Sequence, residues 1–444
     1  MGKQICLILV LLVVTTIQAQ EKSLSFKEVD STTYALYLNE DWKTLLEIGK
    51  KSRTEGIDFY YLKVRMGIAY YKEGKMLSAV KLLEEAYSVN TYDVIVQEYL
   101  YWAYSYSGLI LESHMFYEKM SKQVTDKIQM DLPFVTALDL SVLVTNNSDY
   151  DRLLLANDNV NNNETRYFPK NYQLFSLGLN HPFSNRVNFY HRLSIMPTSS
   201  VQQENLLGKI TNTSYKVDET RYYADMTIGL GNRWYLDTYF NIVFGKYANL
   251  NLNLTGELSA RGPRNINASS FYSSSTLNYT DFVFGGSLTK ASYYVRNTVN
   301  ASVSNLNGFN QFQGGYTMSL YPLGSTLLVP FGAIQFQSQD AKSNMVYTGG
   351  LSVNTTNFSI TAYGNVGELN NFVVNNGSII YNQSATALNE LGLILEFYSK
   401  NTILKVGYSF MEMEDYYYTQ EQIIISEKYQ FNQQNIIGGI TWNF

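Results

Sequence analysis

From residue 134 to the C-terminus, apolar residues alternate with small or polar residues in short segments. In the last segment, Ile436, Gly438, Ile440, Trp442 and Phe444 share one face of a strand, and the residues between them share the other. The charges and glycines of these segments gather mostly on the polar face, whereas a soluble sandwich would carry its charges outward. The pattern therefore predicts a closed membrane barrel with an apolar outside and a wet interior.

The number and spacing of the segments predict how this barrel is connected. Short turns follow the even segments and longer, Asn/Ser/Thr-rich gaps follow most odd ones, which predicts an outer-membrane barrel with both ends on the periplasmic side. The long gaps include 146–170, 199–218, 245–278, 368–386 and 414–431. About fourteen strands are expected, near 134–145, 171–181, 187–197, 220–230, 233–244, 279–289, 292–303, 309–320, 325–337, 344–353, 357–367, 387–398, 402–413 and 432–444.

The first twenty residues read as a secretory signal peptide. Lys3 precedes an apolar run from Ile5 to Val14, and small and polar residues follow it. A membrane anchor is the alternative, but this run is shorter than the roughly 18–20 residues that a spanning helix needs. The mature chain is expected to begin near Gln20 or Glu21, and removal of Cys6 leaves it without cysteine or disulfide.

Between the leader and the barrel, the sequence predicts a helical domain over 21–125 and a linker over 126–133 that ends at Pro133, followed by the barrel over 134–444. The helical domain repeats every 34 residues, pairing Tyr70 with Tyr104 and Gly74 with Gly108. This period resembles the tetratricopeptide repeat family, and 34–49 resembles a degenerate further copy. The resemblance implies a periplasmic solenoid that docks a protein or peptide, and an unrelated helical bundle is the alternative.

The resemblance also assigns roles to residues of the helical domain. The positions matching the repeat imply packing residues, namely Gly67, Tyr70, Ala79, Tyr104 and Gly108. Other tyrosines of the expected inner helices, near 58–72 and 93–107, are candidates for a partner-binding groove because tyrosine combines rigid contact area with a hydroxyl. These candidates are Tyr61, Tyr99, Tyr101 and Tyr106.

Charged residues on the polar face of the strands are expected to point into the lumen. Two interpretations stay open: a network of salt bridges and hydrogen bonds that fills the lumen, or the lining of a pore that guides a substrate. The residues are Asp139, Arg192, Arg221, Asp225, Asp237, Arg296, Glu390, Glu396 and Lys405.

No motif predicts catalysis or a cofactor, so an enzyme is not expected. The three histidines are His114 in the helical domain, His181 beside a turn and His191 on the lipid-facing side, and their sequence spacing predicts no metal pair. The net charge of −5 does not suggest a nucleic-acid partner.

The C-terminal Gly439-x-x-Trp442-x-Phe444 resembles the signal by which the outer-membrane insertion machinery recognises its barrels. The resemblance implies two partners, that machinery and outer-membrane lipid. Ile437 departs from the pattern because a polar residue is preferred there.

In layout, the whole chain resembles the surface lipoprotein assembly modulators and the YaiO-type barrel proteins, which implies an outer-membrane barrel with a periplasmic helical domain. Two hypotheses of function remain. The protein either acts in export or assembly of a client at the cell envelope, or is a closed-lumen anchor that tethers a periplasmic partner complex.

Overall fold

The computed structural model describes residues 25–155, 164–206, 208–251, 274–340, 342–419 and 425–444. The expected signal peptide lies outside these residues. The chain divides into two compact units, Met1–Ala103 and Tyr104–Phe444, with the boundary inside a helix. The helices before the barrel are α2 (Phe26–Leu38), α3 (Trp42–Thr54), α4 (Tyr60–Lys72), α5 (Met76–Val89), α6 (Val94–Tyr106), α7 (Ile110–Tyr117) and α8 (Lys122–Ile128).

These helices begin at a regular spacing of 34 residues. Helices α2, α4 and α6 start at Phe26, Tyr60 and Val94, and their partners α3, α5 and α7 start at Trp42, Met76 and Ile110. The turn inside each pair contains a residue with positive φ, which reverses the chain at Glu40 (φ 56°), Gly74 (φ 73°) and Gly108 (φ 77°). The period read from the sequence is therefore a period of helix pairs. The last helix, α8, continues into the segment 126–133 that was expected to be a linker.

Most of the expected packing residues lie inside this helical array. Ala79 is fully buried, Tyr104 is buried, and Tyr70 packs against a cluster that contains Leu45 and Leu62. A Cβ on Gly67 would lie 2.8 Å from the side chain of Leu83, so glycine permits close helix approach there. Gly108 was wrongly assigned to packing: a Cβ on it would touch nothing within 4 Å, and its role is the positive φ of the turn.

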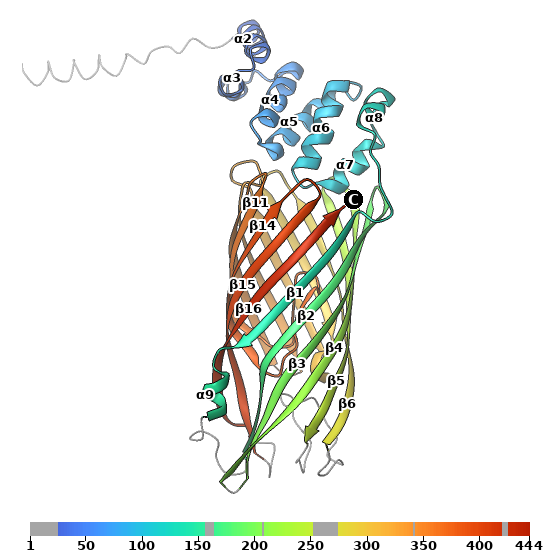
Figure 1. Cartoon of the computed structure of the whole chain (residues 1–444). Helices are drawn as coiled ribbons and strands as arrows, with labels where there is room; N and C mark the ends of the chain where they lie inside the picture. The colour runs from blue at the N-terminus through green and yellow to red at the C-terminus, as the bar shows by residue number, and fades with distance from the viewer. Residues whose placement is uncertain (1–24, 156–163, 207, 252–273, 341, 420–424) are drawn as a thin grey trace, which may run out of the picture. The chain divides into compact units, whose positions relative to one another are not determined.

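Fourteen antiparallel strands close into a barrel in the order β1-β16-β15-β14-β11-β10-β9-β8-β7-β6-β5-β4-β3-β2 (Figure 1). Closure is made between the first and last strands, with Ala137 opposite Asn443 and Asn147 opposite Gln433. The strands are β1 (Ala137–Asn147), β2 (Glu164–Ser184), β3 (Val187–Leu206), β4 (Lys209–Gly231), β5 (Trp234–Asn251), β6 (Ser274–Ala291), β7 (Val295–Ser304), β8 (Gln311–Leu320), β9 (Leu328–Gln339), β10 (Lys342–Asn354), β11 (Phe358–Leu369), β14 (Thr386–Tyr398), β15 (Thr402–Thr419) and β16 (Ile425–Asn443). The segments between them include α9 (Tyr150–Leu155) and η1 (Leu306–Gly308).

The predicted number of barrel strands is confirmed, but several strands are longer than expected. The gap 199–218 was predicted as a long loop, yet β3 reaches Leu206 and β4 begins at Lys209. The extended parts carry Asn, Ser and Thr on both faces, so they lack the alternation of apolar and polar residues. A strand that extends beyond the lipid no longer needs an apolar face. We call the end with Phe444 and the β4–β5 turn the short-turn end, and the opposite end the long-hairpin end.

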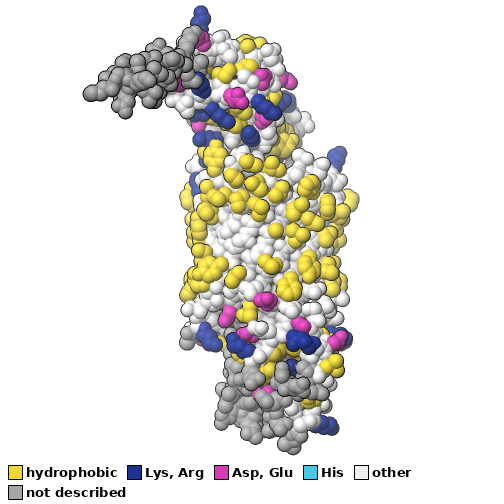
Figure 2. Space-filling model, turned by 90° about the vertical axis from the view of Figure 1, so that its left-hand side faces the viewer, with side chains coloured by type: hydrophobic (Ala, Val, Ile, Leu, Met, Phe, Trp, Pro, Cys, Tyr) yellow, Lys and Arg dark blue, Asp and Glu magenta, His cyan; other side chains and the backbone are white. Residues whose placement is uncertain are grey.

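The outer wall of the barrel is apolar. Leu177, Leu193, Val406 and Ile436 are each about half exposed, and they belong to four different strands. Figure 2 shows hydrophobic side chains over the visible face of the barrel, while charged side chains gather toward the long-hairpin end. Among the described helices, none has both the length and the apolar character needed to cross a membrane.

The C-terminal residues lie on this wall. Trp442 is 51% exposed and Phe444 is 66% exposed, as expected for aromatic residues that meet lipid at an interface. The Phe444 amide donates to the Thr136 carbonyl at 3.0 Å, so the last residue is held beside the start of β1. Gly439 lies opposite Ser141 and Lys405 in the closing strands.

Candidate functional site: the barrel lumen

A small hairpin occupies the lumen of the barrel. The gap 368–386 was predicted as one of the long connections between strands, and residues 370–385 of it turn into the barrel. Within it, β12 (Phe372–Val374) pairs with β13 (Ile379–Tyr381). We call residues 370–385 the plug. The sequence "FVVNNGSIIY" carries the signal that could have found it, two short β-prone runs around Asn-Asn-Gly.

Side chains from the barrel wall hold the backbone of the plug. Arg192 on β3 donates to the Ser378 carbonyl at 2.5 Å, and Asn241 on β5 donates to the Gly377 carbonyl at 3.0 Å. On the other side, Gln313 on β8 both donates to the Val373 carbonyl (2.5 Å) and accepts from the Val373 amide (3.0 Å). Further bonds of this kind run from Tyr223 to Asn376, from Gln337 to Asn370 and Asn371, and from Asn307 to Asn382.

The tip of the plug reverses through left-handed residues. Asn375 (φ 50°), Asn376 (φ 51°) and Gly377 (φ 78°) follow one another. Asparagine and glycine are the residues that tolerate this backbone region best. A Cβ on Gly377 would lie 2.5 Å from the ring of Tyr239, so the turn reaches the wall only because glycine is there.

Apolar side chains fill the lumen toward the long-hairpin end. Phe372 of the plug is fully buried and belongs to a cluster with residues from α9 and from seven barrel strands. We call this set the apolar cluster: Leu153, Phe168, Val201, Val346, Leu369, Phe372, Ala385, Ala387, Met411, Met413, Tyr417, Tyr429 and Phe431. Among the described residues, it packs side chains of the wall, of α9 and of the plug together in this half of the barrel.

Toward the short-turn end, the lumen instead contains a cavity of about 1370 Å³. The tip of the plug, with Asn375 and Asn376, forms one side of this chamber. Its wall mixes aromatic rings such as Tyr223 and Tyr363 with charged groups such as Asp225 and Lys405. The chamber is larger than the roughly 300–1000 Å³ of an ordinary ligand pocket, and polar groups converge on it as they do in such pockets.

Helix α7 lies across part of the chamber. Ile110, Leu111 and His114 line it, together with the segment 131–133. The helix is fixed to two turns of the barrel: Glu112 accepts from the Arg233 amide at 2.6 Å, and Glu118 accepts from the Asn185 side chain at 2.8 Å. Burial lowers the pKa of the His114 imidazole, so this side chain is neutral where it lines the chamber.

Most of the expected lumen charges are tied into hydrogen bonds. Glu390 accepts from Tyr363 (3.1 Å), Asn365 (2.8 Å) and Tyr381 of the plug (2.7 Å). Arg221 bridges Glu219 (2.6 Å) and Asn382 of the plug (2.9 Å). The others follow the same rule: Asp139 accepts from Thr441, Asp237 from Thr227 and Ser287, and Glu396 from Ser359 and Tyr398.

Asp225 and Arg296 behave differently from these tied charges. Both line the chamber, and one side-chain atom of each, Asp225 Oδ1 and Arg296 Nε, is buried without a hydrogen-bond partner. Lys405 also lines the chamber, from β15, which is separated from the β4 strand of Asp225 by β3, β2, β1 and β16. The chamber therefore presents charged groups that the protein itself leaves partly unsatisfied.

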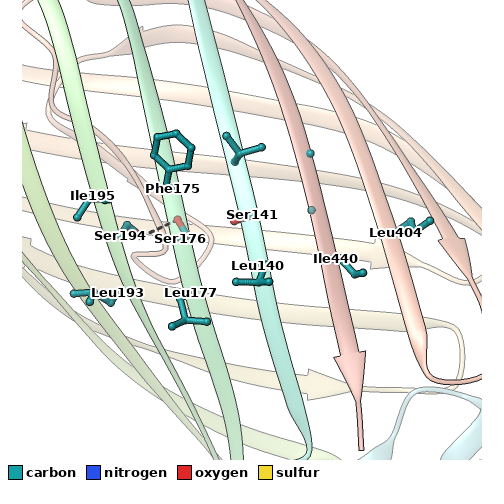
Figure 3. A pocket seen from close by; sticks show the side chains of 13 residues that line it. Leu140, Ser141, Phe175, Ser176, Leu177, Leu193, Ser194, Ile195, Leu404 and Ile440 are labelled. Atoms are coloured by element: carbon teal, nitrogen blue, oxygen red, sulfur yellow. Dashed lines mark hydrogen bonds between the residues drawn. The ribbon is translucent and has the colours of Figure 1, made fainter.

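A second hollow lies on the outer wall where the barrel closes. It has a volume of about 770 Å³ and spans β15, β16, β1, β2 and β3, as Figure 3 shows. Leu140, Phe175 and Leu193 line its apolar surface, while Ser176 and Ser194 bond to each other at 2.8 Å within the wall. This lining suits hydrocarbon, such as a lipid tail, better than a polar ligand.

The four tyrosines proposed for partner binding differ in exposure. Tyr61 is 60% exposed and Tyr106 is 58% exposed. Tyr99 is partly buried and packs against Tyr71, with ring centres 5.1 Å apart. Tyr101 is only 7% exposed, so its expected availability to a partner was wrong. Its ring packs beside Trp102 instead. The position of Tyr101 within the repeat did not predict this contact.

The closed ring of fourteen strands and its apolar outer wall define the class of the protein, a transmembrane β-barrel of the outer-membrane type. No known family model matches the chain, and no curated protein matches it in sequence. Among solved structures, the barrel is similar to a FadL homologue of Pseudomonas aeruginosa (10% identity, TM-score 0.43, covering 70% of this chain and 90% of the other). It is also similar to the toluene transporters TodX of Pseudomonas putida (9%, 0.42, 70% and 90%) and TbuX of Ralstonia pickettii (9%, 0.43, 71% and 90%). These values do not establish a common function.

Proposed function

We propose that the protein is an integral outer-membrane barrel that is closed in its resting state and docks a periplasmic protein through its helical region. The plug carries this proposal, because five wall side chains and Asn307 of η1 hold its backbone and the apolar cluster packs around Phe372. A lumen filled in this way does not admit free diffusion. The plug supports the closed-anchor hypothesis more than an open conduit.

The short-turn end faces the periplasm in this proposal, and the long-hairpin end faces the outside. The aromatic C-terminus supports this orientation, since outer-membrane barrels keep short turns and chain ends on the periplasmic side. Heat-modifiable migration on gels and resistance to carbonate extraction are the expected results for the purified and membrane-bound protein. Recovery as a soluble periplasmic protein would reject the membrane assignment.

Docking is assigned to helices that repeat at tetratricopeptide spacing, because such arrays bind peptides and proteins. We expect a photo-crosslinker at Tyr61 or Tyr106 to capture a periplasmic protein in intact cells, whereas one at the buried Tyr101 does not. A crosslink to the insertion machinery would form only while the barrel is being inserted. It is distinguished from a docked partner because it is no longer formed in cells sampled after protein synthesis has stopped. Adducts only from the long-hairpin end would reject periplasmic docking.

A second candidate function is a gated conduit, and the chamber favours it. A polar hollow with unsatisfied charges is more than an inert anchor needs. If the protein is a gated conduit, an incoming client displaces α7 and then the plug. The hydrogen bonds that hold the plug are numerous but individually modest, about 0.5–1.5 kcal/mol each, so a bound client could offset them.

Conductance in planar bilayers separates the two candidates. The full chain is expected to be silent, and a variant with residues 372–381 replaced by a short glycine linker is expected to conduct. A triple variant, Arg192→Ala, Asn241→Ala and Gln313→Ala, should conduct intermittently, while the matched control Thr289→Ala, Thr298→Ala and Thr317→Ala should stay silent.

The deciding measurement is the conductance of a barrel that lacks residues 21–130 and keeps the plug intact. A barrel that stays silent supports the anchor, and one that opens supports the conduit. An open full-length protein would contradict the closed resting state in both candidates.

A further inference from the structure

Two histidines meet on the outer wall near the short-turn end. His181 on β2 and His191 on β3 are ten residues apart in sequence, but the turn between these strands brings them onto neighbouring positions. Their Nε2 atoms lie 3.2 Å apart. Spacing along the chain does not reveal this pair, since antiparallel pairing rather than linear spacing sets the distance.

The other nitrogen of each ring is also engaged by an oxygen. His181 Nδ1 lies 3.0 Å from the Phe134 carbonyl, and His191 Nδ1 lies 3.2 Å from the Tyr222 hydroxyl. A metal-binding histidine usually donates its second N–H to an oxygen, which fixes the ring and turns the free lone pair toward the metal. Both rings have such an oxygen within hydrogen-bond distance of Nδ1, and their Nε2 atoms lie beside each other.

The separation of the two Nε2 atoms fits one tetrahedral metal ion. Zinc binds imidazole nitrogen at about 2.0–2.1 Å, so two such ligands at a tetrahedral angle lie about 3.3 Å apart. The observed 3.2 Å matches this value. Without metal, the same distance accommodates one N–H···N hydrogen bond between neutral rings. Metal binding would then shift the proton of one ring from Nε2 to Nδ1, with no net release of a proton.

Aromatic rings surround the pair. Phe134, Phe183 and Phe189 have centroids 4.9, 6.5 and 6.4 Å from the centroid of His181. No group of three or more His, Cys, Asp or Glu side chains that could hold a metal occurs among the described residues. The two remaining coordination positions would therefore belong to water or to a lipid phosphate at the membrane surface.

We propose that His181 and His191 form a binding site for a divalent transition metal of the zinc type. The bound ion would link β2 to β3 and, through the Phe134 carbonyl, would fix the segment that enters the barrel. Imidazole ligands with open positions suit zinc, copper and nickel, and tetrahedral geometry favours zinc.

The test uses the purified, folded full chain in detergent, titrated with Zn²⁺ and, for spectroscopy, with Co²⁺. One ion per chain is expected, with a tetrahedral Co²⁺ absorption spectrum. His181→Ala and His191→Ala should each weaken binding at least tenfold, and the third histidine supplies the matched control, His114→Ala, which should leave binding unchanged. Tyr222→Phe should weaken it by about tenfold or more, because it removes an oxygen that orients His191.

Heat-modifiable migration verifies that each variant folds. X-ray absorption on the wild-type protein gives a result that needs no variant: two imidazole nitrogens at about 2.0–2.1 Å from zinc are expected. Wild-type binding no tighter than that of the doubly substituted His181→Ala, His191→Ala protein would overturn the proposal. Loss of the ion in His114→Ala would do the same.

Discussion

The two halves of the lumen are built by the same strands and yet differ in content. Toward the long-hairpin end, Phe372 and the rest of the apolar cluster fill the space, whereas toward the short-turn end a polar chamber of about 1370 Å³ remains. Strand alternation alone decides which residues point inward, but it does not decide whether they meet one another. The plug contributes to the difference, because its Phe372 lies in the apolar cluster whereas its tip, with Asn375 and Asn376, borders the chamber.

The largest effect is expected from truncating the centre of the filled half. Phe372→Ala should lower the free energy of unfolding by about 3–5 kcal/mol, because the ring is fully buried and leaves a cavity. Phe331→Ala, which enlarges a chamber that is already hollow, should cost less than half as much. Urea unfolding followed by heat-modifiable migration measures both, and equal losses would show that the two halves are packed alike.

A smaller effect is expected from carboxylates in the two environments. Glu390→Gln should destabilise the protein by about 1.5–3 kcal/mol, because Glu390 accepts from three donors, one of them Tyr381 of the plug. Asp225→Asn should be neutral or stabilising, because Asp225 Oδ1 has no partner and the carboxylate faces that of Asp237. The same unfolding measurement compares the two variants. A larger loss of unfolding free energy in Asp225→Asn than in Glu390→Gln would mean that the charged residues of the chamber form a structural network.

The smallest effect is expected at the boundary between the halves. Gly377→Ala places a side chain at a φ of 78° and against the ring of Tyr239, so a loss of about 1–2 kcal/mol is expected. Gly349→Ala on β10, where a Cβ would meet nothing within 4 Å, is the matched control and should change stability by less than about 0.5 kcal/mol. If Gly377→Ala leaves both stability and conductance unchanged, the tip of the plug does not need its close approach to β5.

Periodicity in the sequence determined the elements of this protein. A period of 34 residues marked the helix pairs, and alternation marked fourteen strands and the outward faces of residues such as Leu393 and Trp442. These features are local, so a short segment of the sequence is enough to predict each of them. The inward direction of Asp237 and Glu390 followed from the same alternation.

Only the tertiary structure decided what those inward and outward residues touch. The plug bonds to strands far away in sequence, such as β3 and β8, and no periodicity records which loop turns inward. Tyr101 was expected to be exposed and is buried, with its ring beside that of Trp102. His181 and His191 meet because antiparallel register places them on adjacent strands, and the same register leaves Asp225 facing a hollow that a different loop could have filled.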